Sequence, residues 1–446
     1  MSFNIGLSGL RAANKRLEVT GNNIANAGTV GFKSSRADFA DVYSSTRLGS
    51  GSNATGNGVR LANVSQNFRQ GGMNSGTGNV LDMGIQGQGF FVLSENGAMT
   101  YTRAGAFTTD ANNYITNGDR TARLQGYSLD ANGRIQNGKL TDLQIDTSNL
   151  PPKASSSVSS TINMNATAPV INQTDHPFDP TKLDTYSHSY TSPIFDSQGN
   201  QHSVDQYMVK TGANTWASYT LVDGRNPDGS VFDPASQSPL TFTFSTDGKL
   251  ASITPPNPPG YSPVDVSGTT ITLRATGAGA WVPGKVSDGK WTPNGAAAHT
   301  EGVAINMVKT TQYSADYTRV DIIQNGNAAG QIANITIDET GMVFANYTNY
   351  LSKPIGQVAL ASFTNDQGLT PVGNTSWRET RASGSPSYDT PLTGTLGSVE
   401  SGSLEESNVE LGDELVELVR AQSFYQANAK TISTESTIMQ TLFQMT

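Results

Sequence analysis

Four histidines, a glycine cluster and an Asp-x-Asn turn are the features of this chain whose residue types suit catalysis or ligand binding. The histidines are His176, His188, His202 and His299. They lie in strand-like segments without metal-ligand spacing, so we interpret them as surface residues with satisfied hydrogen bonds. The sequence contains no Cys and no G-x-S-x-G motif, which excludes a thiol nucleophile and argues against a serine hydrolase. We therefore expect no enzyme, and no catalytic, cofactor or metal site.

Two motifs resemble ligand loops without completing them. Three glycines precede the strand-like run FFVL: Gly84, Gly87 and Gly89. A dinucleotide-binding loop instead follows a strand and opens a helix, so we expect close backbone packing here. Asp110 and Asn112 have the initial spacing of a calcium loop, but Tyr114 occupies the next ligand position and no Glu closes the loop. We expect a turn at this position.

Composition favours strands and turns. The 446 residues suffice for several domains, and they include 46 Gly, with 15% charged and 35% hydrophobic residues. The net charge of −9 argues against nucleic acid as a partner, because no basic field attracts phosphates. The lack of Cys suits a chain that crosses a membrane unfolded. No apolar run is long enough to span a bilayer, so we expect no membrane insertion.

The first residues do not resemble a secretory signal. Asn4, Gly6 and Ser8 interrupt the apolar positions, and the basic residues follow the apolar ones instead of preceding them. We expect the chain to be cytosolic or to leave the cell by a route that removes no signal peptide.

Seven-residue apolar repeats mark both ends of the chain. The first repeat comprises Phe3, Leu10, Leu17 and Ile24, and the second comprises Leu404, Leu411, Leu418, Tyr425, Ile432 and Met439. Such repeats favour helices whose narrow seams pack on other helices. We predict helices over 2–27 and 404–446 that form a coiled-coil-like domain, with these ten residues as subunit contacts. The ends of the chain thus suit a polymer-forming protein.

Charge and capping patterns support the two helices. Residues 1–36 are mainly basic and residues 404–446 mainly acidic, which favours their pairing. Ser403 with Glu406, and Ser407 with Glu410, have capping-box spacing at the predicted start of the second helix.

The chain between the helices is predicted to be β-rich and nested, giving a mixed, mainly β fold class. An apolar-Asp-x-x-Gly pattern at 129–133, 195–199 and 337–341 predicts hairpin turns. The proline-rich stretch 254–263 cannot pair in a sheet. We predict a terminal helical domain (1–35 with 404–446), an extended linker (36–71), a β-rich middle domain (72–146 with 309–403) and an inserted β-rich domain (147–308).

Three stretches resemble the flagellar rod–hook axial protein family. They are GNNIANAGTVGFKSSRADF (21–39), NVLDMGIQGQGFFVL (79–93) and SNVELGDELVELVRAQSFYQANAKTISTESTIMQTL (407–442). They occur in the family's order and cover most of both ends, whereas the middle of the chain has no matched motif. The chain is most similar to the hook members, because rod members are much shorter and lack a large insertion.

The resemblance implies a structural subunit of the bacterial flagellar hook. The helices would form an inner tube around an export channel, with the middle domain as a shell and the inserted domain outside. Copies would assemble into a flexible tube that couples rod to filament and transmits torque as a universal joint. Implied partners are other copies, rod proteins, hook cap and hook–filament junction proteins, and the flagellar type III export apparatus. The implied location is the hook, outside the cell.

Two alternatives remain open at this point. One is a distal rod-type axial protein. The other, from a different class, is a secreted β-rich adhesin or enzyme that oligomerises through its terminal helices.

Overall fold

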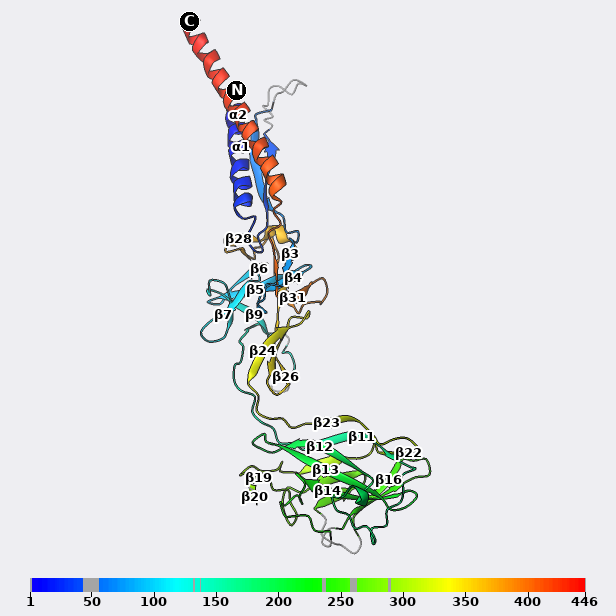
Figure 1. Ribbon diagram of the computed structural model, residues 1–446. Helices are drawn as coiled ribbons and strands as arrows, with labels where there is room; N and C mark the ends of the chain where they lie inside the picture. Colours follow the sequence, from blue (N-terminus) through cyan, green and yellow to red (C-terminus); the bar gives the residue numbers. More distant parts are fainter. Residues whose placement is uncertain are drawn as a thin grey trace. The chain divides into compact units, whose positions relative to one another are not determined.

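The computed structural model describes residues 2–42, 56–130, 133–136, 138–234, 238–256, 263–287 and 290–445. The contacts divide the chain into two compact units. The first unit comprises Met1–Thr147, Ala333–Asn346 and Ser352–Thr446, and the inserted unit comprises Ser148–Ile332 and Tyr347–Leu351. Strands dominate both units, and long helices lie near both ends of the chain (Figure 1), so the predicted fold class is confirmed.

The terminal helices begin and end close to the predicted positions, with one correction. Helix α1 spans Ser2–Ala25 and α2 spans Leu411–Met445. The second helix was predicted to begin at Leu404, but Leu404 lies in strand β32 (Ser403–Glu405), which pairs with β3 (Met73–Ser75). Ser403 and Glu406 therefore do not form a capping box, because the buried pairing of β32 takes precedence over local helix propensity. Ser407 lies four residues before α2, and its Oγ accepts a hydrogen bond from the amide of Val409 (3.3 Å).

The predicted linker contains a β-hairpin. Strand β1 (Ser35–Asp41) pairs antiparallel with β2 (Val59–Gln66), with a bulge between Asp38 and Phe39. Both strands contact α1. The run VRLANVSQ contains β-branched and aliphatic residues, but the strand was not predicted because its alternation is broken and it adjoins a Gly/Ser/Asn-rich stretch. Most of that stretch, residues 43–55, lies outside the described residues.

A twisted antiparallel sheet forms the middle of the first unit. Its strands follow the order β24 (Ile332–Ile337), β25 (Met342–Tyr347), β26 (Ser352–Val358), β9 (Arg123–Ser128), β5 (Phe90–Glu95), β6 (Ala98–Thr102), β29 (Ser376–Arg378) and β28 (Thr370–Gly373). Shorter strands attach to it: β7 (Phe107–Thr109), β8 (Ile115–Asn117), β10 (Thr141–Asp142), β27 (Leu360–Ser362) and β30 (Ser387–Asp389). Beside the sheet, β4 (Met83–Gln86) pairs with β31 (Ser398–Ser401). Strand β9 precedes the inserted unit in the chain and β26 follows it, and the two strands pair with each other. The sequence indicated this, because a similar β-pattern occurs before and after the insertion.

The glycine cluster and the aspartate turns follow the predictions. Gly87 has a φ of 118°, and a Cβ there would lie 3.0 Å from the Cα of Gly397, so the backbones approach closely. Asp110 Oδ1 accepts hydrogen bonds from the backbone amides of Asn112 (2.8 Å) and Tyr114 (2.9 Å), as an Asx turn does. The glycines that close the three predicted hairpin turns all have positive φ: Gly133, Gly199 and Gly341.

The inserted unit is built from two packed sheets and a hairpin. One sheet has the order β17 (Val264–Ser267), β18 (Thr270–Leu273), β21 (Val303–Asn306), β11 (Ser157–Asn165) and β22 (Thr311–Tyr313), with β23 (Thr318–Gln324) paired to β11. The other has the order β12 (His188–Phe195), β13 (Gln201–Lys210), β14 (Thr215–Val222), β15 (Leu240–Phe244) and β16 (Leu250–Thr254). Strands β19 (Gly284–Ser287) and β20 (Lys290–Pro293) form the hairpin. One apolar cluster unites both sheets around Ile162, Trp216 and Ile271.

The inserted unit extends further along the chain than the sequence indicated. Residues 309–332 were predicted to belong to the middle domain, but β22 and β23 pair with β11 of the inserted unit. Most of the proline-rich stretch 254–263 lies outside the described residues. Within the described residues, no helix is both long enough and apolar enough to cross a bilayer.

Candidate assembly site: the terminal helices and their junction

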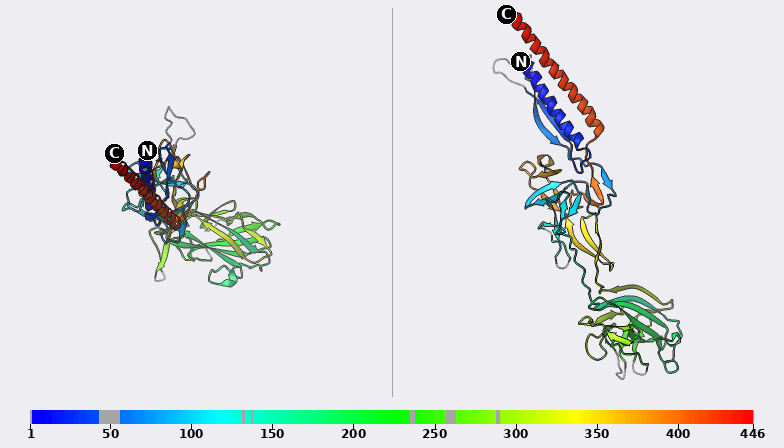
Figure 2. Two further views of the ribbon diagram at one scale, coloured as in Figure 1. Left: turned by 90° about the horizontal axis from the view of Figure 1, so that it is seen from above. Right: turned by 60° about the vertical axis from the view of Figure 1, so that its left-hand side comes forward.

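Helices α1 and α2 lie side by side in antiparallel orientation (Figure 2). Glycines on α1 allow the close contact, since a Cβ at Gly6 would lie 3.1 Å from Cγ1 of Ile432. A Cβ at Gly9 would lie 2.2 Å from Oδ1 of Asn428. Ala13, Thr20 and Asn23 are also buried on α1. The helices therefore pack through a stripe of small residues.

The predicted seam of α1 is not the row that is most deeply buried within the chain. Phe3 is 46% exposed, and the other three α1 seam residues, Leu10, Leu17 and Ile24, are half-buried. The seven-residue repeat was assigned from large apolar residues, whereas the buried residues of α1 include Gly6, Ala13 and Thr20. Their seven-residue spacing was visible in the sequence, but small residues give little hydrophobic signal.

The α2 seam residues divide into two groups. Leu418 and Ile432 are half-buried, and Ile432 contacts α1, whereas Leu411, Tyr425 and Met439 are 39–53% exposed. Leu404 belongs to β32, as described above. Their role as contacts between subunits stays a prediction.

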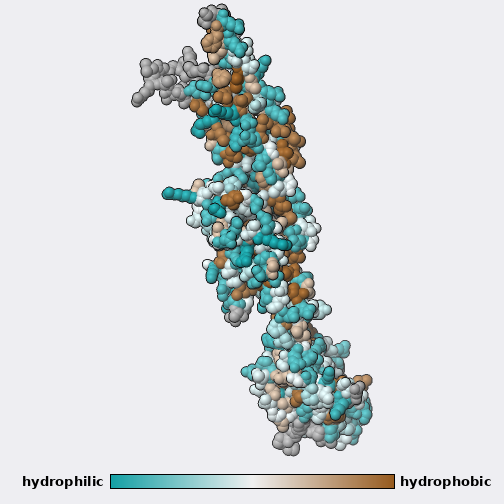
Figure 3. All heavy atoms as spheres, turned by 90° about the vertical axis from the view of Figure 1, so that its left-hand side faces the viewer, coloured by the Kyte–Doolittle hydropathy of each residue, from teal (hydrophilic) through white to brown (hydrophobic). Residues whose placement is uncertain are grey.

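Helix α2 carries several large apolar residues that are exposed in the single chain. We call the following residues, each at least 50% exposed, the α2 apolar surface: Leu411, Leu415, Val416, Val419, Ile438 and Met439. Phe424 is also exposed, but the guanidinium of Arg16 on α1 lies over its ring, 5.7 Å from the centroid. Figure 3 shows hydrophobic residues gathered over the terminal helices. Because Gly6 pairs with Ile432, the last residues of α2 extend beyond the start of α1 (Figure 2).

Polar contacts fix the register of the two helices. The guanidinium of Arg16 on α1 contacts the carboxylate of Glu417 on α2, as the complementary charges predicted. Asn23 Nδ2 donates hydrogen bonds to Glu414 Oε1 (2.9 Å) and to the backbone oxygen of Ser35 (2.8 Å). Burial raises the pKa of Glu414, and the nearby carboxylates of Glu417 and Asp413 add to the rise against the opposing hydrogen bond from Asn23.

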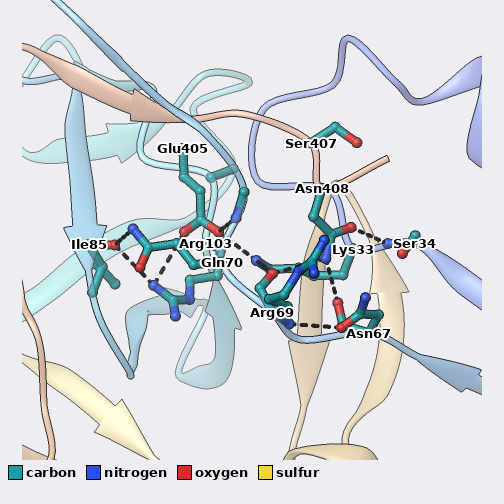
Figure 4. Close-up of polar contacts among 12 residues, drawn as sticks. Lys33, Ser34, Asn67, Arg69, Gln70, Ile85, Arg103, Glu405, Ser407 and Asn408 are labelled. Carbon is teal, nitrogen blue, oxygen red and sulfur yellow. Dashed lines mark hydrogen bonds and ion pairs between the residues drawn. The ribbon is translucent and has the colours of Figure 1, made fainter. Parts of the chain in front are cut away.

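A buried charge cluster joins both helices to the middle of the first unit (Figure 4). Lys33 Nζ lies 2.5 Å from Glu405 Oε1, and Arg103 Nη1 lies 3.3 Å from Glu405 Oε2. The side chains of Lys33 and Glu405 are fully buried, and that of Arg103 is 5% exposed. We call these three residues the junction cluster. Sequence reasoning missed it, because no local pattern marks an ion pair between residues so distant in the chain.

Backbone groups complete the surroundings of the cluster. Lys33 Nζ also donates to the backbone oxygen of Arg69 (2.8 Å), and the amide of Gly71 donates to Glu405 Oε1 (3.0 Å). Glu405 Oε2 accepts no hydrogen bond from the described residues, so its interaction with Arg103 is an ion pair only. Burial lowers the pKa of Lys33 and of Arg103, and the charge of Glu405 partly opposes both effects.

Asn408 extends the junction. Its Oδ1 accepts a hydrogen bond from the amide of Ser34 (2.8 Å), and its Nδ2 donates to the backbone oxygens of Asn67 (2.7 Å) and Arg69 (2.9 Å). The amide of Gly31 donates to the backbone oxygen of Glu405 (2.7 Å). The segments after α1 and before α2 are therefore bonded to each other.

The prediction that all four histidines lie on the surface is wrong for one of them. His202 is buried, not on the surface, and its ring nitrogens lie 2.6 Å from Asp223 Oδ2 and 3.3 Å from Asp196 Oδ2. Trp281 packs against the ring in an edge-on orientation. Within the described residues, no group of three or more His, Asp or Glu side chains is placed to hold a metal ion.

Four family models match different parts of the chain. They are "Flagella basal body rod protein" (3–33), "Flagellar hook protein FlgE/F/G D1 domain" (84–165), "Flagellar basal body protein FlaE D2 domain" (163–327) and "Flagellar basal body rod FlgEFG protein C-terminal" (400–445). The last and first matches include α2 and most of α1.

Curated relatives match over all or nearly all of their length. The chain is 33% identical to the flagellar hook protein FlgE of Escherichia coli and 34% identical to that of Salmonella typhimurium, with 100% of each chain covered. It is 30% identical to the hook protein of Borreliella burgdorferi, over 99% of this chain and 98% of the relative. Among solved structures, Helicobacter pylori FlgE2 matches with 14% identity and a TM-score of 0.48, covering 76% of this chain and 100% of that chain.

Proposed function

This chain belongs to the flagellar hook protein family and is a hook subunit, and from this premise we propose that its terminal helices build a flexible tube of many copies. Membership of this family implies a structural homopolymer within the flagellum. In the proposed assembly, the tube joins the rod to the filament, transmits torque and bends as a universal joint.

The α2 apolar surface carries this proposal. Residues such as Val419 (61% exposed) and Leu415 (52% exposed) remain open to solvent in the single chain. Burying a large apolar side chain contributes roughly 1.5–3 kcal/mol, so these residues favour association once partners cover them. Copies of the same chain are the partner that a hook subunit meets, and the full set of ten predicted seam residues is proposed to contribute contacts.

The layers of the tube follow from the nested chain. We propose the terminal helices as the inner layer, the β-rich part of the first unit as the middle layer and the inserted unit as the outer layer. Rod proteins, hook cap proteins and hook–filament junction proteins are the proposed partners at the ends of the tube.

Export and the absence of catalysis belong to the same proposal. A subunit that assembles outside the cell needs a route out, for which we propose the flagellar type III apparatus without cleavage of a signal peptide. No enzymatic role is proposed, because the family to which the chain belongs is one of structural flagellar proteins.

Electron microscopy of concentrated purified protein tests the proposal. Hollow tubes of indefinite length are expected. Discrete trimers or other closed oligomers would instead favour the secreted adhesin or enzyme alternative, and short straight tubes that resist bending would favour a rod-type protein.

A further inference from the structure

We propose that Glu405 is a positioning residue, whose buried carboxylate makes the docking of α1 and the docking of α2 on the middle sheet depend on each other. The inference rests on the hook-subunit function and adds how the subunit orders its two ends. It concerns the junction cluster, which connects three separate parts of the chain (Figure 4).

Each member of the cluster comes from a different part. Lys33 lies in the segment that follows α1, Glu405 lies in β32 just before α2, and Arg103 lies in the loop after β6. The Lys33–Glu405 pair closes over 372 positions of chain. A single carboxylate therefore links the segment that follows α1 and the segment that precedes α2 to the middle sheet.

The charges make partial docking unfavourable. If β32 is absent, the ammonium of Lys33 and the guanidinium of Arg103 are two buried cations without the carboxylate between them. If the Lys33 segment is absent, Glu405 Oε1 keeps the amide of Gly71 but loses its ammonium donor. Removing one partner from a buried ion pair leaves an uncompensated charge, which is costly. The complete cluster avoids both states.

Hydrogen bonds that involve the backbone add to the dependence between the docking of α1 and the docking of α2. The amide of Gly31 donates to the backbone oxygen of Glu405, and Asn408 bonds to Ser34 on one side and to Asn67 on the other. A displaced β32 would therefore remove acceptors from the segment that leads out of α1. This is a continuous chain of contacts between the two helices at their junction end.

Reciprocal substitutions test the dependence. In Glu405→Gln the shape is kept and the charge removed, and in Lys33→Met the ammonium is removed. Hydrogen exchange is measured for α1 and α2 amides in assembled protein. Glu405→Gln should accelerate exchange in α1, and Lys33→Met should accelerate it in α2, each by about tenfold or more. Acceleration confined to the helix next to the substitution, or rates equal to wild type, overturns the inference.

The exposed pair Arg69–Glu410 supplies a matched control. It links similar segments at 3.4 Å, but its side chains are 69% and 68% exposed. Arg69→Gln should leave exchange in both helices within about twofold of wild type, because exposed pairs contribute little. An equal effect of Arg69→Gln and Glu405→Gln would show that burial of the cluster is irrelevant, and would overturn the inference.

Variants that fail to assemble are still informative. If Glu405→Gln leaves exchange in β5 and β9 unchanged while assembly is lost, the helices have lost their docking and the inference is supported. If β5 and β9 also become unprotected, Glu405 serves the general fold and the inference is overturned. Lys33→Met/Glu405→Gln should lose less than the sum of its single variants, because only the guanidinium of Arg103 is then left without its ion-pair partner. Tube formation by the wild type tests the proposed function separately.

Discussion

The amide of Asn23, near the end of α1, donates a 2.9 Å hydrogen bond to the carboxylate of Glu414, near the start of α2. Asn23 is 1% exposed, and it also exchanges hydrogen bonds with the backbone of Ser35 through both side-chain atoms. One side chain thus fixes the second helix and the β1–β2 hairpin to the first helix.

Asn23→Asp should loosen the helix pair. The substitution replaces a donor by a second carboxylate beside Glu414, so it removes two hydrogen bonds and adds repulsion. We expect a loss on the order of 1–3 kcal/mol, measured as faster proteolysis of the terminal helices in the full chain. Asn22→Asp, at an exposed neighbouring position, is the control. Equal protection of the helices in the two variants would contradict the assigned bond.

Val419→Asp should block assembly without unfolding the subunit. Val419 is 61% exposed in the single chain, so the free monomer should lose no more than about 0.5 kcal/mol. In the tube, a carboxylate covered by a neighbouring copy would have to be desolvated, and the cost recurs in every subunit. Sedimentation should therefore detect monomers at concentrations where wild type polymerises. Thr434→Asp, at an exposed polar position of α2, should still polymerise; normal tubes from Val419→Asp would exclude this surface from the interface.

Gly31→Ala should destabilise the junction. Gly31 has a φ of 69°, and an added Cβ would lie 2.4 Å from the backbone nitrogen of Ala104. Backbone cannot move aside as a side-chain end can, so a loss of about 1–3 kcal/mol in unfolding free energy is expected. Gly28→Ala is the matched control, because a Cβ there would have no neighbour within 4 Å. Chemical denaturation of both variants measures the difference.

His202 should make the stability of the inserted unit depend on pH. Burial disfavours its charged form, but hydrogen bonds and charges from Asp223 and Asp196 outweigh burial and raise the pKa of His202. The stabilisation is therefore fully present below the unfolded pKa, about 6.5, and is lost as the pH rises through the raised folded pKa. Calorimetry should show His202→Gln melting below wild type at about pH 6, with a smaller gap at about pH 9. His176→Gln, whose ring is 57% exposed, should match wild type at both values.

The part of the fold that the sequence predicted is the part with local periodicity. The seven-residue repeats located both helices, and the Asp-x-x-Gly turns located hairpins, because those signals depend on residues only a few positions apart. The junction cluster was not predicted, since Lys33 and Glu405 meet only through the fold. Leu404 was misplaced for the same reason: its strand pairs with β3, far away in the sequence. The face of α1 that packs on α2 was not predicted, because glycine carries no apolar signal.

Replacing residues 148–332 by a short Gly/Ser linker should leave assembly intact and alter bending. The chain enters and leaves the inserted unit along paired segments, with Leu150 bridged to Gly330 and Lys153 bridged to Asn327. A short linker can therefore span the gap at a modest entropic cost. The unit also has its own core around Trp216, so its removal exposes little of the first unit's core.

Cells that carry this deletion should form hooks of changed shape and swim abnormally, because contacts at the largest radius of a tube move furthest as it curves. In a matched control, the same linker is inserted between Thr147 and Ser148 and no residue is deleted. The hooks of this control should be normal. Residues 347–351, which belong to the inserted unit, remain in the deletion variant at the turn between β25 and β26, and Tyr350 there is 99% exposed. Its replacement by Ser in the same variant guards against nonspecific aggregation. If hooks are absent while the shortened subunit is stable and exported, the inserted unit holds the polymer together, and the proposed layering is wrong.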